Sequence, residues 1–185
     1  MRNYMENILN ELSNNAKKID TDELSEFVAQ IKKAGHIFLA GAGRSGIVVQ
    51  AFANRLLHLG FSISIIGEIS SPHSQEGDLM IICSGSGETD SLKILSSSAQ
   101  QNNVDIALVT MKKHSTIARQ ANTILTLPGI TKYEETKNDH QSFSQPMGTN
   151  FEQLAFLTFD SLILNLMDKI GETSETMLKR HANFE

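Results

Sequence analysis

A loop rich in serine and glycine is the segment of this sequence best suited to bind a phosphate group. It follows an apolar run, leads into a predicted helix near Asp90, and consists of Ser84, Gly85, Ser86, Gly87, Glu88 and Thr89. The glycines let backbone N–H groups face a ligand, the three hydroxyls are neutral donors, and the helix N-terminus adds partial positive charge. A Ser/Thr cluster can also cap a helix, but one cap needs only one hydroxyl. The pattern therefore favours a phosphate-monoester site.

A second glycine-rich loop follows an earlier apolar run and also opens a helix. It consists of Gly41, Ala42, Gly43, Arg44, Ser45 and Gly46, which matches G-x-G-x-x-G, and Glu68 lies 22 residues beyond it. This spacing is typical of a dinucleotide site whose acid binds a ribose, and also of a plain tight turn between strand and helix. A dinucleotide enzyme of this length would have almost no chain left for a substrate domain. We therefore favour a sugar-phosphate site here too.

Three side chains in these loops have alternative roles. Arg44 has forked donors that suit a phosphate or sugar oxygen, or an ion pair with a neighbouring subunit. The hydroxyl of Ser45 is predicted to donate to the substrate, the alternative being a helix N-cap. A carboxylate beside a phosphate is unfavourable, so we expect Glu88 to stabilise the N-terminus of the next helix while its backbone remains available to the ligand.

The elements that must position these loops alternate between apolar runs and helical segments. The apolar runs occupy residues 36–40, 63–66, 79–83, 106–109 and 124–127. Helices are predicted at residues 4–18 and at residues 147–170. A further helix is predicted to begin at an N-cap at Thr21 and to stop at Gly35. This alternation predicts an α/β fold, a doubly wound five-stranded parallel sheet flanked by helices. Ligands bind at the carboxyl ends of such strands, where both loops lie.

Composition narrows the possible functions. The 185 residues are 40% hydrophobic and 20% charged, which fits one domain over residues 1–185. A net charge of -5, without a Lys/Arg stripe, argues against a nucleic-acid partner. The single cysteine, Cys83, excludes an internal disulfide and a cysteine-based metal site. Neither a signal peptide nor a membrane-spanning apolar stretch is recognisable, so we expect a cytoplasmic location and no membrane partner.

Together the two loops resemble the sugar isomerase (SIS) domain family, whose ligands are phosphosugars. Within that family, residues 145–153 and the tail at residues 180–183 are similar to those of the 6-phospho-3-hexuloisomerases, and the likeness covers essentially the whole chain. The resemblance implies a flavodoxin-like sheet, a homo-oligomer that is often a tetramer, and no metal or organic cofactor. It also implies interconversion of D-arabino-3-hexulose 6-phosphate and D-fructose 6-phosphate, in the ribulose monophosphate pathway of formaldehyde fixation or detoxification.

Such a reaction moves a carbonyl from C3 to C2 through a 2,3-enediolate and needs a base that reaches both carbons. The resemblance assigns the catalytic carboxylate to Glu152. The alternative from spacing alone is a T-x-x-E capping box, in which Glu152 bonds back to Thr149. The resemblance also implies that His181 reaches an active site, in its own subunit or a neighbouring one, whereas residues so close to a chain end are usually solvated.

The predicted helix at residues 147–170 is apolar on nearly every side, which indicates a subunit interface. The polar stretch at residues 131–145 before it is predicted to be the one long loop. Two other functions stay open: isomerisation of a different phosphosugar, and a module that senses phosphosugars without turnover. The absence of a helix-turn-helix extension and the presence of a carboxylate in the base position favour an enzyme.

Overall fold

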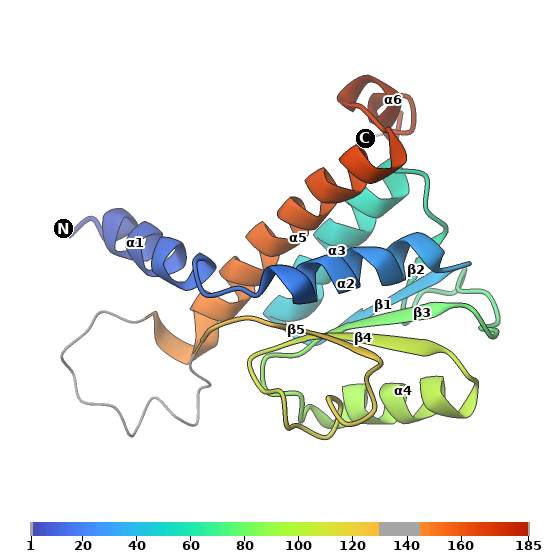
Figure 1. Ribbon diagram of the computed structural model, residues 1–185, viewed down its shortest axis with the longest axis horizontal. Helices are drawn as coiled ribbons and strands as arrows, with labels where there is room; N and C mark the ends of the chain where they lie inside the picture. Colours follow the sequence, from blue (N-terminus) through green and yellow to red (C-terminus); the bar gives the residue numbers. More distant parts are fainter. Residues whose placement is uncertain (1, 130–144, 185) are drawn as a thin grey trace.

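The computed structural model describes residues 2–129 and 145–184, and its centre is a five-stranded parallel sheet (Figure 1). The strands are β1 (Ile37–Gly41), β2 (Ile63–Ile65), β3 (Leu79–Cys83), β4 (Asp105–Thr110) and β5 (Thr123–Thr126). Their order is β2-β1-β3-β4-β5, and every neighbouring pair is parallel. The α/β prediction is confirmed, and each apolar run matches its strand to within one residue at each end.

Alternate residues of the central strands enter two separate apolar cores, one on each face of the sheet. In β3, Leu79, Ile81 and Cys83 belong to the core that includes α3 (Arg44–His58). Met80 and Ile82 belong to the other core, which includes α4 (Asp90–Gln101). Successive side chains of a strand point to opposite faces, so a strand covered on both faces must be apolar at every position. This is why continuous apolar runs predicted these strands correctly.

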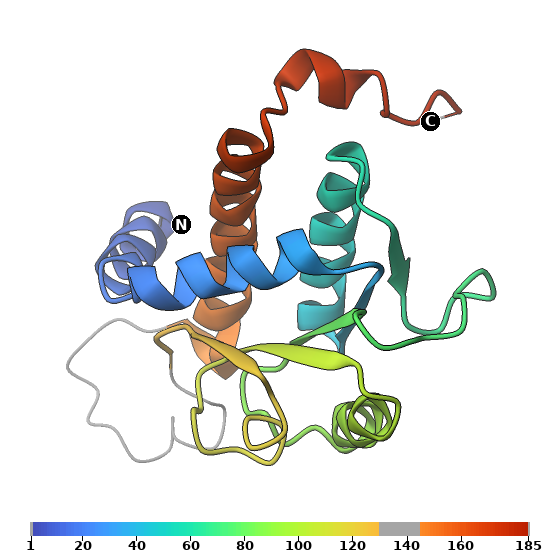
Figure 2. The same cartoon turned by 45° about the vertical axis from the view of Figure 1, so that its right-hand side comes forward.

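The helices lie in layers on both sides of the sheet (Figure 2). On one side α2 (Thr21–Lys33) and α3 pack on the strands, α5 (Thr149–Ile170) packs against α3, and α1 (Met5–Ala16) packs against α5, while α4 covers the opposite face. The turn η2 (Pro146–Gly148) precedes α5, and the short helix α6 (Ser174–Leu178) follows it. In the described part of the chain, none of the helices is both long and apolar enough to span a bilayer.

Two local features differ from the sequence prediction. The N-cap of α2 is Asp20 and not Thr21: the Asp20 carboxylate accepts hydrogen bonds from two N–H groups of the first turn, at 2.8 and 3.4 Å. Both residue types are favoured at N-caps, so the pattern alone did not distinguish them. Helix α6 was not predicted because five residues are too few to show a helical period. Of the loop predicted at residues 131–145, all but Gln145 lies outside the described residues.

Candidate active site

Strands β1 and β3 end side by side at the centre of the sheet, and both predicted ligand loops start there. In their register Gly41, the last residue of β1, pairs with Cys83, the last residue of β3. The chain continues from β1 to β2 on one side of this pair and from β3 to β4 on the other side. The strand order therefore reverses between β1 and β3. In open parallel sheets the crevice at such a point is the usual ligand site. The fold thus brings the two loops together where the sequence predicted a site.

The first loop is shaped by the close approach of its two outer glycines. A Cβ atom on Gly41 would lie 2.9 Å from the backbone N of Gly46, and one on Gly46 would lie 2.9 Å from the carbonyl O of Gly41. Gly43, with a φ of 58°, is the N-cap of α3. The capping alternative for Ser45 is therefore wrong, and this residue lies in the first turn with 8% of its surface exposed. Glu68, the acid of the dinucleotide alternative, accepts a hydrogen bond from a backbone N–H at the end of β2, at 3.4 Å.

The second loop, residues 84–89, is held in shape by its own hydroxyl groups; we call it the serine loop. The N–H of Gly87 donates to Ser84 Oγ and the N–H of Glu88 donates to Ser86 Oγ, each at 3.2 Å. A hydroxyl that accepts a bond from the backbone keeps its hydrogen for another acceptor, so both serines can still donate to a ligand. Among the described residues, the N–H groups of Ser86 and Thr89 have no acceptor. Thr89 is the N-cap of α4 but makes no side-chain capping bond, so capping does not explain the hydroxyl cluster.

A turn after β4 supports the serine loop from one side. Gly87 has a φ of 63°, and a Cβ atom there would lie 2.0 Å from Ser115 Oγ, so only glycine fits. The carbonyl O of Gly85 accepts hydrogen bonds from the N–H of Met111 at 3.0 Å and from the hydroxyl of Thr110 at 3.1 Å. The shape of the loop therefore depends on a turn that the serine-glycine motif does not contain.

The Glu88 side chain also links the serine loop to the turn after β4. Its carboxylate accepts a hydrogen bond from the N–H of Thr116 at 2.6 Å and lies 4.0 Å from Lys93 Nζ. The Thr116 backbone bond, followed by a bond from the Thr116 hydroxyl, holds the pKa of Glu88 below its ordinary value. Glu88 directly precedes the N-cap of α4, but the N–H group that its carboxylate meets belongs to the turn and not to the helix. That this carboxylate stabilises the start of α4 through its charge stays a prediction.

Glu152 lies in the first turn of α5 and faces the first loop. The capping box considered for it does not form: the N-cap is Gly148, and Thr149 Oγ1 donates to the carbonyl O of Pro146 at 2.7 Å. Instead, the Glu152 carboxylate accepts a hydrogen bond from Arg44 Nε at 3.1 Å. The Glu152 side chain is 16% exposed and that of Arg44 is 61% exposed. The structure thus joins the two predicted site residues within one chain.

Two further contacts lie close to Glu152, at the carboxyl ends of β1 and β3. A Cβ atom on Gly85 would lie 3.1 Å from the ring of Phe151, so the serine loop packs on the residue before Glu152. The fully buried Cys83 lies beside the Ser45 side chain. Burial raises the pKa of the Cys83 thiol to about 12; the Ser45 side chain opposes this rise and the negative charge of Glu152 adds to it. A neutral thiol thus lies beneath the two loops, which sequence reasoning missed although Cys83 ends a central strand.

His181 does not lie with the other predicted site residues of its own chain. Its ring stacks on the ring of the buried His58, with centroids 4.9 Å apart. His58 is the last residue of α3 and Arg44 is the first, so roughly 21 Å of helix separates them. The neighbouring Arg180 donates to both carboxylate oxygens of Glu172 at 2.8 Å and to the carbonyl O of His58 at 3.0 Å. The tail is therefore anchored at the end of α3 opposite the crevice.

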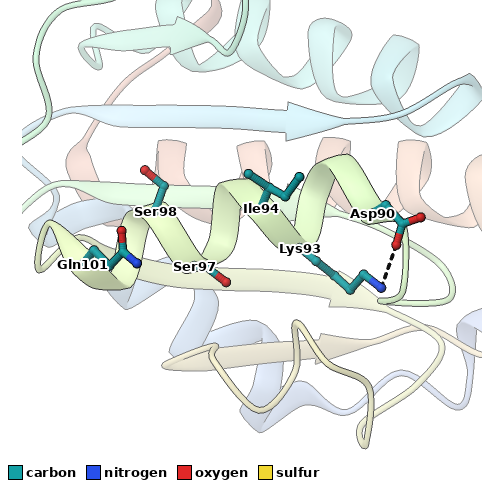
Figure 3. A pocket seen from close by; sticks show the side chains of 6 residues that line it. All are labelled: Asp90, Lys93, Ile94, Ser97, Ser98 and Gln101. Carbon is teal, nitrogen blue, oxygen red and sulfur yellow. Dashed lines mark ion pairs between the residues drawn. The ribbon is translucent and has the colours of Figure 1, made fainter.

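Two hollows on the described surface lie away from the crevice. One of about 520 Å³ follows the outer side of α4, where Figure 3 shows Lys93 turned toward Asp90, 2.7 Å away. Another of about 360 Å³ lies between α3 and α5 and is lined by Val48, Ala51, Phe52, Asn54, Arg55, Phe156, Phe159 and Asp160. Neither hollow is lined by Arg44 or Glu152. Within residues 2–129 and 145–184, no group of three or more His, Cys, Asp or Glu side chains is placed to hold a metal ion.

Comparison with known proteins agrees with this architecture. The chain matches the model of the SIS domain over residues 30–163. It is 44% identical to the 3-hexulose-6-phosphate isomerase of Bacillus subtilis over 182 residues, which are 98% of this chain and 97% of that protein. It is 34% identical to the 3-hexulose-6-phosphate isomerase of Methylomonas aminofaciens over 189 aligned positions that cover 100% of both chains.

Among solved structures, a hypothetical protein of Methanococcus jannaschii matches with a TM-score of 0.83 and 29% identity, over 98% of each chain. Its crystal structure is described as inferring a molecular function of 3-hexulose-6-phosphate isomerase. The SIS domain match spans most of the sequence, and the likeness to the Bacillus subtilis protein spans nearly all of it. The chain therefore belongs to the SIS domain family.

Proposed function

We propose that this protein is a 3-hexulose-6-phosphate isomerase, which interconverts D-arabino-3-hexulose 6-phosphate and D-fructose 6-phosphate through a 2,3-enediolate. The observation that carries the proposal is the position of Glu152: its carboxylate accepts a hydrogen bond from Arg44 of the loop after β1, and the neighbouring Phe151 packs on Gly85 of the loop after β3. A base there can reach a sugar whose phosphate is bound by the serine loop. The curated relatives of that name support the choice among phosphosugars, and with it a role in the ribulose monophosphate pathway.

The serine loop supplies a site for a phosphate dianion without a lysine. The hydroxyls of Ser84 and Ser86 and the N–H groups of Ser86 and Thr89 are its donors, and the N-terminus of α4 adds partial positive charge. The turn after β4 holds these groups in place before a ligand arrives, which lowers the entropy lost on binding. We assign the phosphate to this loop and the reacting carbons to the space near Ser45 and Glu152.

Glu152 is assigned as the base that moves one proton between neighbouring carbons. It removes the proton from C2, the electrons of that C–H bond form the C2=C3 double bond, and the C3 carbonyl oxygen becomes an oxyanion. After the proton on the C2 oxygen has passed to the C3 oxygen, Glu152 returns its proton to C3 and C2 becomes the carbonyl carbon. The hydroxyl of Ser45, in the first turn of α3, is assigned as a donor to the developing oxyanion.

We also propose that the protein works as a homo-oligomer in which α3 and α5 contact a second copy. On α5, Phe156, Leu157 and Leu164 are 43%, 52% and 63% exposed, and the hollow between the helices holds both Arg55 and Asp160. A two-fold contact would bring Arg55 of each copy near Asp160 of the other. The same symmetry would lay the tail of the second copy, which carries His181, beside the crevice. Two such dimers would form the tetramer that the family resemblance implies.

The assay that tests the proposed function mixes the purified protein with D-arabino-3-hexulose 6-phosphate and a metal chelator, and follows D-fructose 6-phosphate. We expect turnover, and we expect five- and seven-carbon phosphosugars in the same assay to react far more slowly. Faster turnover of one of those sugars would reassign the substrate. Binding of the hexulose phosphate without turnover would instead favour the phosphosugar-sensing module.

A further inference from the structure

The ion pair between Arg44 and Glu152 uses only one edge of its arginine. Arg44 donates to Glu152 through Nε, and among the described residues its two terminal nitrogens have no acceptor. The carboxylate is largely shielded at 16% exposure, whereas 61% of the Arg44 side chain faces solvent. The guanidinium thus holds Glu152 with one edge and presents two parallel N–H donors with the other.

This pair is poorly suited to a structural role. An ion pair with one partner in water contributes little to stability. Helices α3 and α5 are already joined by the stacked rings of Phe52 and Phe159, whose centroids are 4.2 Å apart. The contact between Arg44 and Glu152 is therefore better explained by a role in the reaction of the Glu152 carboxylate than by a contribution to the stability of the fold.

We propose that Arg44 is a catalytic residue that bridges Glu152 and the two neighbouring oxygens of the enediolate; the inference rests on the proposed function. When Glu152 takes the C2 proton, its negative charge is lost and an equal charge develops on the C3 oxygen. The free edge of the guanidinium fits two adjacent oxygens, as it fits the two oxygens of a carboxylate. Because one cation contacts the negative charge before and after the transfer, the site needs little rearrangement as the charge moves.

The competing role for Arg44 is to bind the substrate phosphate, and the two roles differ in which ligands they favour. An enediolate bridge strengthens binding of ligands that mimic the planar intermediate. A phosphate contact strengthens binding of every ligand that carries the phosphate. Lysine in place of Arg44 separates the roles further, because it keeps the charge but its three N–H donors diverge from one nitrogen and cannot present two parallel donors to adjacent oxygens.

The test compares Arg44→Lys and Arg44→Gln with the wild type in kinetics and in binding of two inhibitors. One inhibitor is a hydroxamate that mimics the enediolate and carries the sugar phosphate; the other is glucitol 6-phosphate, which has the phosphate but no carbonyl. We expect kcat to fall about 100-fold or more and the hydroxamate Kd to rise by a similar factor. We expect KM and the glucitol 6-phosphate Kd to change less than about threefold, since neither reports the intermediate. Arg2→Gln, which removes an exposed guanidinium before α1, is the control for loss of charge.

Equal weakening of both inhibitors would overturn the bridge and make Arg44 a phosphate ligand. Wild-type turnover with unchanged kcat in both Arg44 variants would overturn this inference alone. A wild type that turned over no phosphosugar would overturn the proposed function and the inference with it. Thermal unfolding of each variant identifies a loss of activity caused by misfolding, which we do not expect for so exposed a side chain.

Discussion

Two arginine–glutamate pairs lie at opposite ends of α3 and are built differently. At the tail end, Arg180 donates through both terminal nitrogens to both oxygens of Glu172 at 2.8 Å, and also to the carbonyl O of His58 at 3.0 Å; we call this the closed pair. At the crevice end, Arg44 donates through Nε alone to one oxygen of Glu152 at 3.1 Å; we call this the open pair. The closed pair uses both terminal nitrogens of its arginine on the protein, while those of the open pair have no acceptor in the described part of the chain.

On the proposed function, the difference separates a structural from a functional use of the same two residue types. In the closed pair, hydrogen bonds from Arg180 and then from Thr176 lower the pKa of Glu172 to about 2, and the tail is anchored at α3. The open pair ties the loop after β1 to the first turn of α5 while keeping its remaining donors available. What distinguishes the two pairs is the number of donors left free, a property that residue types do not reveal.

The largest expected effect comes from removing the carboxylate of the open pair. Glu152→Gln keeps the size of the side chain and an acceptor for Arg44, but the amide cannot take up the substrate proton. We expect kcat for the hexulose phosphate to fall about 10²–10⁴-fold, the usual contribution of a general base. We expect thermal stability to change little, because the pair is half in water. Steady-state kinetics and thermal unfolding of the same preparation measure both.

The matched change at the closed pair is Glu172→Gln, which should lower thermal stability more than Glu152→Gln does. It removes the charge that both terminal nitrogens of Arg180 contact. A Glu152→Gln enzyme with nearly normal kcat would show that another group is the base, and the functional reading of the open pair would fail.

The glycines at the two ends of α3 give a smaller, structural contrast. Gly43 has a φ of 58° and no atom within 4 Å of the place of a Cβ, whereas Gly60 has a φ of 90° and a Cβ there would lie 3.3 Å from Arg180 Nε. Alanine is strained at both positions, at a cost of about 1–3 kcal/mol each. Only Gly60→Ala also pushes on the closed pair, so we expect it to be the more destabilising change in urea unfolding. Equal losses would mean that the Arg180 guanidinium moves aside without weakening its bonds.

The contacts made by Glu152 and Glu88 show what the sequence could and could not predict. The strands and both loops were predictable, because buried parallel strands need apolar residues throughout and close backbone approaches need glycine. The contact of Arg44 with Glu152 spans 108 residues, and that of Glu88 with Thr116 spans 28. No local spacing encodes such pairs. Local helix rules therefore missed the bond of Glu88 with Thr116, and the capping box they suggested for Glu152 does not form.

The smallest expected effect is a change with pH in the stability that the closed pair contributes. The pKa of Glu172 falls from an ordinary value of 4.5 to about 2 because of its bonds with Arg180 and Thr176. A carboxyl whose pKa is lower in the folded state stabilises the fold above its unfolded pKa and loses this contribution as pH falls through its folded pKa. We therefore expect the stability gap between wild type and Glu172→Gln to be constant from about pH 7 to about pH 5.5, and to shrink steadily toward about pH 2.

Urea unfolding at a series of pH values measures this gap. Glu175→Gln, in the neighbouring helix α6, is the matched control. Glu175 is 83% exposed and, among residues 2–129 and 145–184, pairs only with Lys179, at 3.7 Å, so its removal should have a small effect with no comparable trend. A gap for Glu172→Gln that stayed constant down to about pH 3 would contradict the prediction, because a carboxyl held ionised by the fold must release that stabilisation as it protonates. The closed pair would then anchor the tail through the His58 carbonyl bond, and its difference from the open pair would lie in geometry alone.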